Sequence, residues 1–129
     1  MAKAASPSFS IAELSNEFGI TARALRFYED EGLLAPWREG ASRRYSIRDR
    51  IRLGWILRGK RVGFSLAEIR EMIEAQERAD DPAAQRNITI QRCRARIDRL
   101  QNQKMEIEQA LGELGAFVAG LAVARRVAG

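Results

Sequence analysis

Residues 9–34 read FSIAELSNEFGITARALRFYEDEGLL, and this stretch decides the fold. Three apolar residues at helical spacing form one face of a first short helix: Ile11, Leu14 and Phe18. Gly19 ends that helix, the Thr21 hydroxyl caps the next one, and Gly32 ends the second. Two short helices joined by a tight glycine-containing turn form a helix-turn-helix, which places its second helix in a DNA major groove.

The second helix has two different sides. At about 100° per residue, one side holds Ala24, Leu25 and Tyr28, which can pack on the first helix. The opposite arc holds Arg23, Arg26, Phe27 and Asp30. This arc is either a solvated charged face with one exposed aromatic, or a DNA-reading face. We favour the second interpretation, in which Arg23 reaches base edges while Arg26 and Phe27 meet the sugar-phosphate backbone.

The composition excludes several classes of protein. The chain has 129 residues, no histidine and one cysteine, Cys93, and this length fits one domain or a small domain with an extended helix. Histidine, the commonest general base and metal ligand in proteins, is thus absent. A single cysteine fits a reducing compartment. No signal peptide precedes the first helix, and no apolar run approaches the roughly 18 residues of a membrane span. We therefore expect a cytoplasmic protein with no membrane partner.

The positive charge lies in the first half of the chain. Of a net charge of +5, residues 1–64 carry all the excess, with 12 Lys and Arg against 7 Asp and Glu, whereas residues 65–129 hold 10 of each. Within residues 38–61 the balance sharpens to 9 basic against 2 acidic residues. This concentration suits a polyanion; a membrane surface is a weaker candidate, because no strongly apolar helix face backs the basic residues.

A basic hairpin is predicted after the helix-turn-helix. Residues 35–46 read APWREGASRRYS, with Pro36, Gly40 and Ser42 as turn residues between two short extended pieces. The alternative is a flexible loop. We prefer a wing that carries four candidate contact residues: Arg38, Arg43, Arg44 and Tyr45.

Two further helices follow the wing. Ser46 caps a third helix that runs to about Val62, and its expected inward residues are Ile47, Ile51, Trp55, Leu57 and Val62. Of its many basic residues, we place Arg48, Lys60 and Arg61 near DNA. Gly59 lowers its helix propensity by roughly 1 kcal/mol and allows a bend. A capping box of Ser65 and Glu68 begins the fourth helix, which includes Ile69, Met72 and Ile73. The sequence Asp80-Asp81-Pro82 is expected to end this helix.

A heptad pattern occupies the next part of the chain. Eight residues are spaced alternately three and four apart: Ile90, Cys93, Ile97, Leu100, Lys104, Ile107, Leu111 and Leu114. Such a narrow seam favours pairing with another helix, most simply in a second copy of the chain. Arginines dominate the first half of this helix and glutamates the second, so antiparallel pairing brings opposite charges together. Lys104 at an a position helps to fix the register. An intrachain helical hairpin is disfavoured, because the remaining residues contain no second long helix.

The predicted architecture is mainly α, a winged helix-turn-helix DNA-binding domain followed by a long antiparallel coiled-coil dimerisation helix. The expected divisions are a disordered tail at 1–8, the DNA-binding domain at 9–76, an acidic hinge at 77–86, the dimerisation helix at 87–115 and a short C-terminal tail at 116–129. In this tail we expect a short helix that packs on the pair.

With these motifs in place, the chain resembles MerR-family transcriptional regulators. The resemblance covers residues 9–73 in the family's order, and its specific elements are RALRFYE, GLLAPWR, RRYS and GFSL. It implies a winged-helix homodimer on a near-palindromic promoter site, which bends and untwists the spacer so that RNA polymerase engages both promoter elements. It also implies that Arg23 reads bases, that Arg26, Phe27 and Tyr28 hold phosphates, and that Arg38, Arg43 and Tyr45 act from the wing. The full predicted DNA-binding set is Thr21, Arg23, Arg26, Phe27, Tyr28, Arg38, Arg43, Arg44, Tyr45, Lys60 and Arg61.

The resemblance also bears on the effector. The family's metal sensors place cysteines beyond the start of the dimerisation helix and in a loop after it, but nothing after Cys93 here can supply a thiolate or imidazole. Cys93 sits at a d position, where a small buried residue packs. We therefore expect no metal and no cofactor. Residues 58–70, RGKRVGFSLAEIR, resemble the subgroup that controls branched-chain amino-acid and fatty-acid catabolism, which implies an acyl metabolite or acyl-CoA as the small-molecule effector.

Two other functions fit parts of the sequence. An architectural DNA-binding protein without an effector would bind all sequences alike, with an affinity that falls steeply with salt. A coiled-coil adaptor would use its basic half to bind an acidic protein and would not protect DNA. We expect no enzymatic activity, because the chain offers no histidine and no convergent pair of carboxylates on a glycine-rich or strand scaffold.

Overall fold

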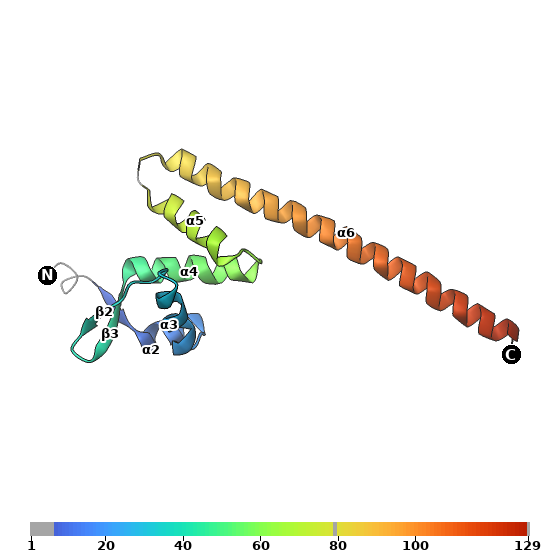
Figure 1. Ribbon diagram of the computed structural model, residues 1–129, viewed down its shortest axis with the longest axis horizontal. Helices are drawn as coiled ribbons and strands as arrows, with labels where there is room; N and C mark the ends of the chain where they lie inside the picture. The colour runs from blue at the N-terminus through green and yellow to red at the C-terminus, as the bar shows by residue number, and fades with distance from the viewer. Residues whose placement is uncertain (1–6, 79, 129) are drawn as a thin grey trace. The chain divides into compact units, whose positions relative to one another are not determined.

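The computed structural model describes residues 7–78 and 80–128 of the chain (Figure 1). In chain order the elements are β1 (Ser8–Ser10), α2 (Ile11–Phe18), α3 (Ala22–Asp30), β2 (Trp37–Glu39), β3 (Ser42–Ser46), α4 (Ile47–Arg61), α5 (Leu66–Glu77) and α6 (Pro82–Ala128). They fall into two compact units, residues 1–85 and residues 86–129. The mainly helical class that we predicted is confirmed.

The helix-turn-helix of α2 and α3 ends where the local signals predict. Gly19 follows α2 with a φ of 67°, in the left-handed region that favours glycine. The Thr21 Oγ1 accepts a hydrogen bond from the backbone N–H of Ala24 at 3.0 Å, so Thr21 caps α3. Gly32 follows α3 with a φ of 75°. Each of these ends is determined by residues within one turn, and for this reason sequence alone was enough to place them.

The wing is a hairpin of β2 and β3 that is extended to three strands by β1. The sheet order is β1-β3-β2 and both pairings are antiparallel, with Phe9 opposite Tyr45 and Arg38 opposite Arg43. Strand β1 begins at Ser8, within the segment 1–8 that we expected to be disordered; residues 1–6 lie outside the described part. The error has a simple origin, since a strand of three residues is too short to show an alternating pattern.

The inward face of α4 differs from our prediction. Ile47, Ile51 and Val62 were expected inside, but their side chains are exposed. Trp55 and Leu57 are half-buried. The buried residues of α4 are instead Asp49, Leu53, Ile56 and Gly59. Because this helix carries apolar residues on two opposite sides, its periodicity could not identify the side that faces the core.

The core of the first unit lies where α2, α3, β3, α4 and α5 meet. Its fully buried large side chains are Leu14, Leu25, Leu33, Tyr45, Leu53, Ile56, Ile69 and Ile73. Gly59 lies inside α4, which runs from Ile47 to Arg61, and the bend that we expected there stays a prediction. The glycine serves close packing: a Cβ built on Gly59 would lie 2.7 Å from Cγ1 of Ile69 on α5. The Ser65–Glu68 capping box that we predicted does begin α5.

The second unit consists of α6, whose bounds correct several predictions. We expected a hinge at 77–86, a dimerisation helix at 87–115 and a separate tail at 116–129. Instead α5 ends at Glu77, and one continuous helix runs from Pro82 to Ala128. The Asp81 Oδ1 accepts hydrogen bonds from the backbone N–H groups of Ala83 and Ala84 at 3.1 and 3.2 Å. Asp80-Asp81-Pro82 therefore begins a helix, with proline in the first turn, where its missing N–H costs nothing.

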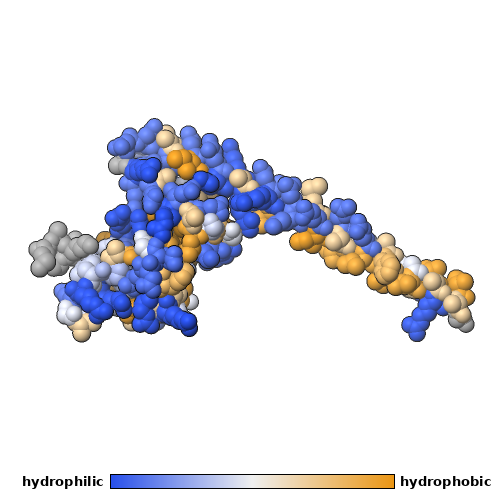
Figure 2. Space-filling view, viewed as in Figure 1, coloured by the Kyte–Doolittle hydropathy of each residue, from blue (hydrophilic) through white to orange (hydrophobic). Residues whose placement is uncertain are grey.

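The apolar side chains of α6 are exposed in the single chain. Figure 2 shows them gathered along the C-terminal part of the helix. An 18-residue stretch of α6 reaches a mean hydropathy of 1.4, so our expectation that no apolar stretch approaches a membrane span was wrong. Length and composition are weak grounds for a span, because a helix that pairs with another helix passes the same test.

The close approach at Gly59 predicts the effect of adding one methyl group. Gly59→Ala should lower the free energy of unfolding by about 1–3 kcal/mol in urea titrations, because the new Cβ overpacks against Ile69. Gly54→Ala is the matched control on the same helix, since its Cβ would meet nothing nearer than Cε1 of Phe18 at 4.0 Å. This control should be neutral or stabilising by up to about 1 kcal/mol. Equal effects of the two substitutions would contradict the packing assignment.

Candidate nucleic-acid interface

The outward face of α3 is formed by Arg23, Arg26 and Phe27. All three side chains are exposed, and the exposed fraction of Phe27 is 47%. On the opposite side Leu25 is fully buried and Tyr28 retains an exposed fraction of 8%, so the predicted division of the helix is confirmed. The rings of Phe27 and Tyr28 meet edge to face with centroids 5.6 Å apart. Tyr28, which we predicted as a phosphate contact, therefore supports Phe27 from the core side.

Tyr45 joins the wing to α3 from inside the protein. We predicted that it contacts DNA, but its side chain is fully buried. Its hydroxyl donates a hydrogen bond to Oε2 of Glu29 at 2.9 Å, and Nε of Arg43 lies 3.2 Å from Oε1 of the same carboxylate. Burial, and then the Glu29 carboxylate, raise the pKa of Tyr45 well above its usual value, so the hydroxyl stays protonated as a donor. Glu29, on the last turn of α3, thus ties the reading helix to β3.

The wing arginines have different surroundings. Arg44 donates hydrogen bonds to the hydroxyl and the backbone carbonyl of Ser8, which links β3 to β1. Arg43 is paired with Glu29. Arg38, on β2, is exposed. Of our wing candidates, Arg38 is therefore the best placed to reach a phosphate, whereas Arg43 and Arg44 also hold the hairpin in position.

Two further predicted contacts lie at the end of α4. Lys60 and Arg61 are exposed, and the chain turns directly after them at Gly63, whose φ is 91°. Thr21 is also exposed, although its hydroxyl already caps α3. These residues remain candidates for phosphate contacts, because exposed basic and hydroxyl side chains position a protein on DNA without reading its sequence.

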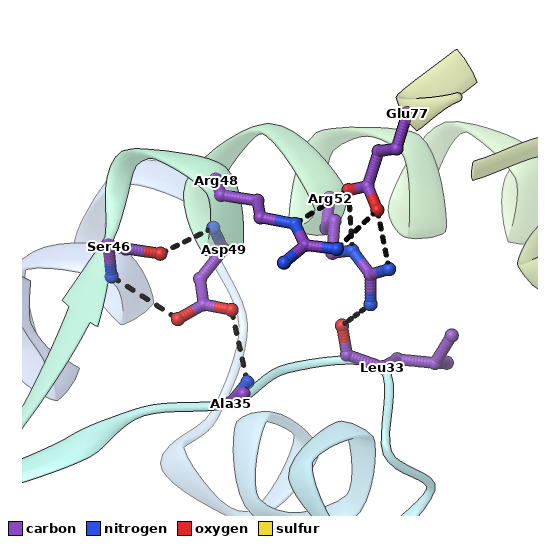
Figure 3. Close-up of polar contacts among 7 residues, drawn as sticks. All are labelled: Leu33, Ala35, Ser46, Arg48, Asp49, Arg52 and Glu77. Carbon is purple, nitrogen blue, oxygen red and sulfur yellow. Dashed lines mark hydrogen bonds and ion pairs between the residues drawn. The ribbon is translucent and has the colours of Figure 1, made fainter. Parts of the chain in front are cut away.

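The segment between α3 and the wing is held by α4 (Figure 3). Oδ1 of Asp49 accepts from the backbone N–H of Ala35 at 3.0 Å, and Oδ2 accepts from that of Ser46 at 3.2 Å. Nη1 of Arg52 donates to the backbone carbonyl of Leu33 at 2.9 Å. We did not identify Asp49 from the sequence, although its position three residues after Ser46 is a capping-box signal.

Glu77 joins the end of α5 to the same side of α4 (Figure 3). Its carboxylate accepts two hydrogen bonds from Arg52, both at 2.8 Å, and two from Arg48, at 3.1 and 2.6 Å. Arg48, which we placed near DNA, is therefore engaged by Glu77. The hydrogen bonds from Arg52 and then Arg48 lower the pKa of Glu77 from 4.5 to about 2.

Comparison with known proteins assigns the family. The profile described as "MerR HTH family regulatory protein" matches residues 9–76, and the one described as "MerR, DNA binding" matches residues 50–117. The chain belongs to the MerR family. It therefore carries the DNA-binding part of a transcriptional regulator of this family.

Individual relatives agree with this assignment. The HTH-type transcriptional activator TipA of Streptomyces coelicolor is 36% identical over 110 residues, which cover 81% of this chain but only 41% of TipA. The HTH-type transcriptional regulator HmrR of Rhizobium leguminosarum is 31% identical over 106 residues, covering 81% of this chain and 82% of HmrR. The solved structure of HiNmlR, a MerR family regulator lacking the sensor domain and bound to promoter DNA, aligns with a TM-score of 0.60 at 27% identity, covering 81% and 79% of the two chains. These homologues are transcriptional regulators, not enzymes.

Metal ligands do not gather in the part of the chain that the structure describes. Across residues 7–78 and 80–128, no group of three or more His, Cys, Asp or Glu side chains could hold an ion. Cys93 is a free thiol on α6, half-buried in the single chain. Its predicted role as a packing residue in a paired seam stays a prediction.

The Glu77 contacts predict a dependence of stability on pH. A carboxyl whose pKa is lowered on folding stabilises the protein above its ordinary pKa, and this stabilisation disappears as the pH falls through the folded-state value. Glu77→Gln should therefore lower the free energy of unfolding at neutral pH, and its difference from wild type should shrink as the pH falls from 4.5 toward about 2. Urea unfolding at a series of pH values measures this difference.

Glu74→Gln is the matched control for this prediction, because it removes one charge from the same helix without touching the two arginines. Its effect should be small at every pH. A Glu77→Gln difference that stayed constant across the acidic range would contradict the assignment of Glu77 as a charged partner of Arg48 and Arg52.

Proposed function

We propose that the protein acts as a homodimer that binds a near-palindromic promoter site through α3 and the wing, with α6 as the dimerisation helix. The observation that carries this proposal is the exposed apolar seam of α6. The exposed fractions of Leu100, Leu111 and Leu114 are 40%, 63% and 62% in the single chain. Exposed leucines repeated at heptad spacing indicate a missing helical partner. A second copy is the simplest one, since it presents the same surface.

The charges on α6 favour antiparallel pairing. Arginines at 86, 92, 94, 96 and 99 precede the seam's centre, and glutamates at 106, 108 and 113 follow it. A parallel pair would stack arginines on arginines, whereas an antiparallel pair places arginines opposite glutamates. Antiparallel pairing also puts the two DNA-binding domains at opposite ends of the paired helices, which suits two separated half-sites.

In each half-site, Arg23 reads base edges and the surrounding side chains hold the backbone. Arg23 lies in the first turn of α3, where a recognition helix approaches the bases. The candidate phosphate and sugar contacts are exposed side chains: Arg26 and Phe27 on α3, Arg38 on the wing, and Lys60 and Arg61 at the end of α4. Thr21, Arg43 and Arg44 contribute from positions that already have structural partners.

Regulation follows from holding DNA at two half-sites. A dimer that bends and untwists the unread centre of its site uses indirect readout, and it thereby brings both promoter elements into reach of RNA polymerase. An effector then has only to favour one dimer geometry over another. A lead(II)-bound regulator is among the homologues, but the described part of this chain offers no comparable set of ligands. We propose a small non-metal effector for this cytoplasmic regulator, of the acyl or acyl-CoA class that the sequence resemblance implies.

The role of Arg23 can be tested by substitution. Arg23→Ala should weaken binding to the specific promoter by about 1–3 kcal/mol while leaving binding to scrambled DNA little changed, because a bidentate base contact discriminates between sequences. Fluorescence anisotropy at one fixed salt concentration measures both affinities. Arg26→Ala is the control, and it should weaken both by similar factors. Equal losses for Arg23→Ala on the two DNAs would indicate an architectural binder.

The dimer can be tested at the seam. Leu100→Asp should yield monomers in sedimentation velocity, because it buries a charge at a d position of the paired helices. Asn102→Asp, two residues away and off the seam, introduces the same charge and should leave the dimer intact. An unchanged mass for Leu100→Asp, or a monomeric wild-type protein, would refute the dimer.

A further inference from the structure

We propose that Arg48 and Arg52 form a binding site for the carboxylate of a small organic acid, and that Glu77 occupies this site as an internal competitor. The acid would enter the cavity beside the two arginines and take the place of the Glu77 side chain. The regulatory part of this proposal rests on the proposed function, whereas the binding of the acid does not.

The geometry of the arginine pair is already that of a carboxylate receptor. Arg48 and Arg52 are one helical turn apart on α4, and each directs Nε and Nη2 at the same two oxygens of Glu77. This two-pronged donation from a planar guanidinium matches a carboxylate and confers directional specificity. Two neighbouring positive charges also repel one another when no anion lies between them. The pair therefore favours an anion, whether it belongs to the chain or to a ligand.

A cavity adjoins this pair. It has a volume of about 260 Å³ and is lined by Ala35, Ser46, Arg48, Asp49 and Arg52. This volume is somewhat below that of pockets for drug-sized ligands, and so suits an acid of a few carbon atoms. Asp49 would repel an anion, but its two oxygens are engaged by the backbone N–H groups of Ala35 and Ser46. Figure 3 shows the guanidinium groups of Arg48 and Arg52 turned toward Glu77, whereas the Asp49 carboxylate turns toward Ala35 and Ser46.

Displacement of Glu77 would act at a sensitive position. Glu77 is the last residue of α5, and α6 begins at Pro82. Arg52 also binds the carbonyl of Leu33, in the segment between α3 and the wing. An acid that replaces Glu77 would keep the arginines neutralised while releasing the end of α5 from α4. In the proposed dimer, this changes how firmly each DNA-binding domain is joined to α6.

Binding can be tested on the free full-length protein with butyrate as the probe. Nitrogen-15 NMR follows the Nε–H resonances of Arg48 and Arg52, which single substitutions of each arginine assign. Butyrate should shift both resonances saturably, and the neutral isostere butyramide should shift neither. Glu77→Ala should bind butyrate about tenfold more tightly or better, because the competing side chain is gone. Glu74→Ala, the matched control on α5, should bind like wild type, and Arg48→Ala should bind more weakly.

The release of α5 has its own readout. Arg78 is exposed and directly follows Glu77, so trypsin cleavage after it reports on the end of α5. In the wild-type protein, saturating butyrate should make this cleavage faster than it is without butyrate. In Glu77→Ala, the cleavage should already be fast without butyrate. Saturable binding with no change in this cleavage in either protein would refute the competition by Glu77. The absence of saturable shifts in both wild type and Glu77→Ala would refute the site. Tighter binding of inorganic phosphate than of butyrate would refute the carboxylate assignment.

The same preparations should be titrated with promoter DNA. Binding of promoter DNA without binding of butyrate would refute this inference but leave the proposed function intact. Binding of butyrate without binding of promoter DNA would support the carboxylate site but refute the proposed function.

Discussion

Hydrogen bonds from α4 fix the segment between α3 and the wing, and the arrangement of the elements in the DNA-binding half depends on them. Asp49 and Arg52, three residues apart on one helix, fix the backbone of Ala35 and Leu33 by three-ångström hydrogen bonds. Asp49 is 4% exposed, and a buried carboxylate is tolerated only when its oxygens are hydrogen-bonded. Two side chains of α4 therefore determine the backbone path from α3 to the hairpin. Apolar packing alone would not fix this path.

Glu29 extends this constraint to the DNA-facing surface. Because its carboxylate binds both Tyr45 and Arg43, the last turn of α3 and the middle of β3 are held together. In the proposed complex, α3 and the wing would therefore meet DNA as one rigid body. Within one half-site the protein therefore has little freedom to adapt, and where the proposed dimer also holds its two domains at a fixed separation, the deformation falls on the DNA. This rigidity is the structural basis for our proposal that the spacer is distorted.

The sequence predicted those features that neighbouring residues determine, and it failed where distant residues decide. Caps at Ser46, Ser65 and Thr21 need only partners within one turn, and all were predicted. Tyr45 looked like a DNA contact because its carboxylate partner, Glu29, lies far away in the sequence, and the pairing of Arg43 with the same carboxylate was missed for the same reason. Pro82 was ambiguous for another reason, since proline disfavours helix before it and favours helix after it. The two apolar sides of α4 likewise needed the fold itself to decide between them.

The interaction energies at the end of α5 and along the α6 seam differ, and this difference is the reason that the proposed regulation acts near Glu77 and leaves the seam unchanged. Each Ile or Leu buried in a paired seam contributes roughly 1.5–3 kcal/mol, so the seam as a whole is far too stable for a small ligand to open. The side chain of Arg48 is 68% exposed, so its pairing with Glu77 resembles a surface ion pair of about 1 kcal/mol or less, whereas the Arg52 side chain is 15% exposed and holds Glu77 more firmly. Coupling free energies between sites are typically 1–3 kcal/mol. The Glu77 contacts are therefore weaker than the whole seam and closer to the range that a ligand can change, and Glu77 ends α5 just before the chain enters α6.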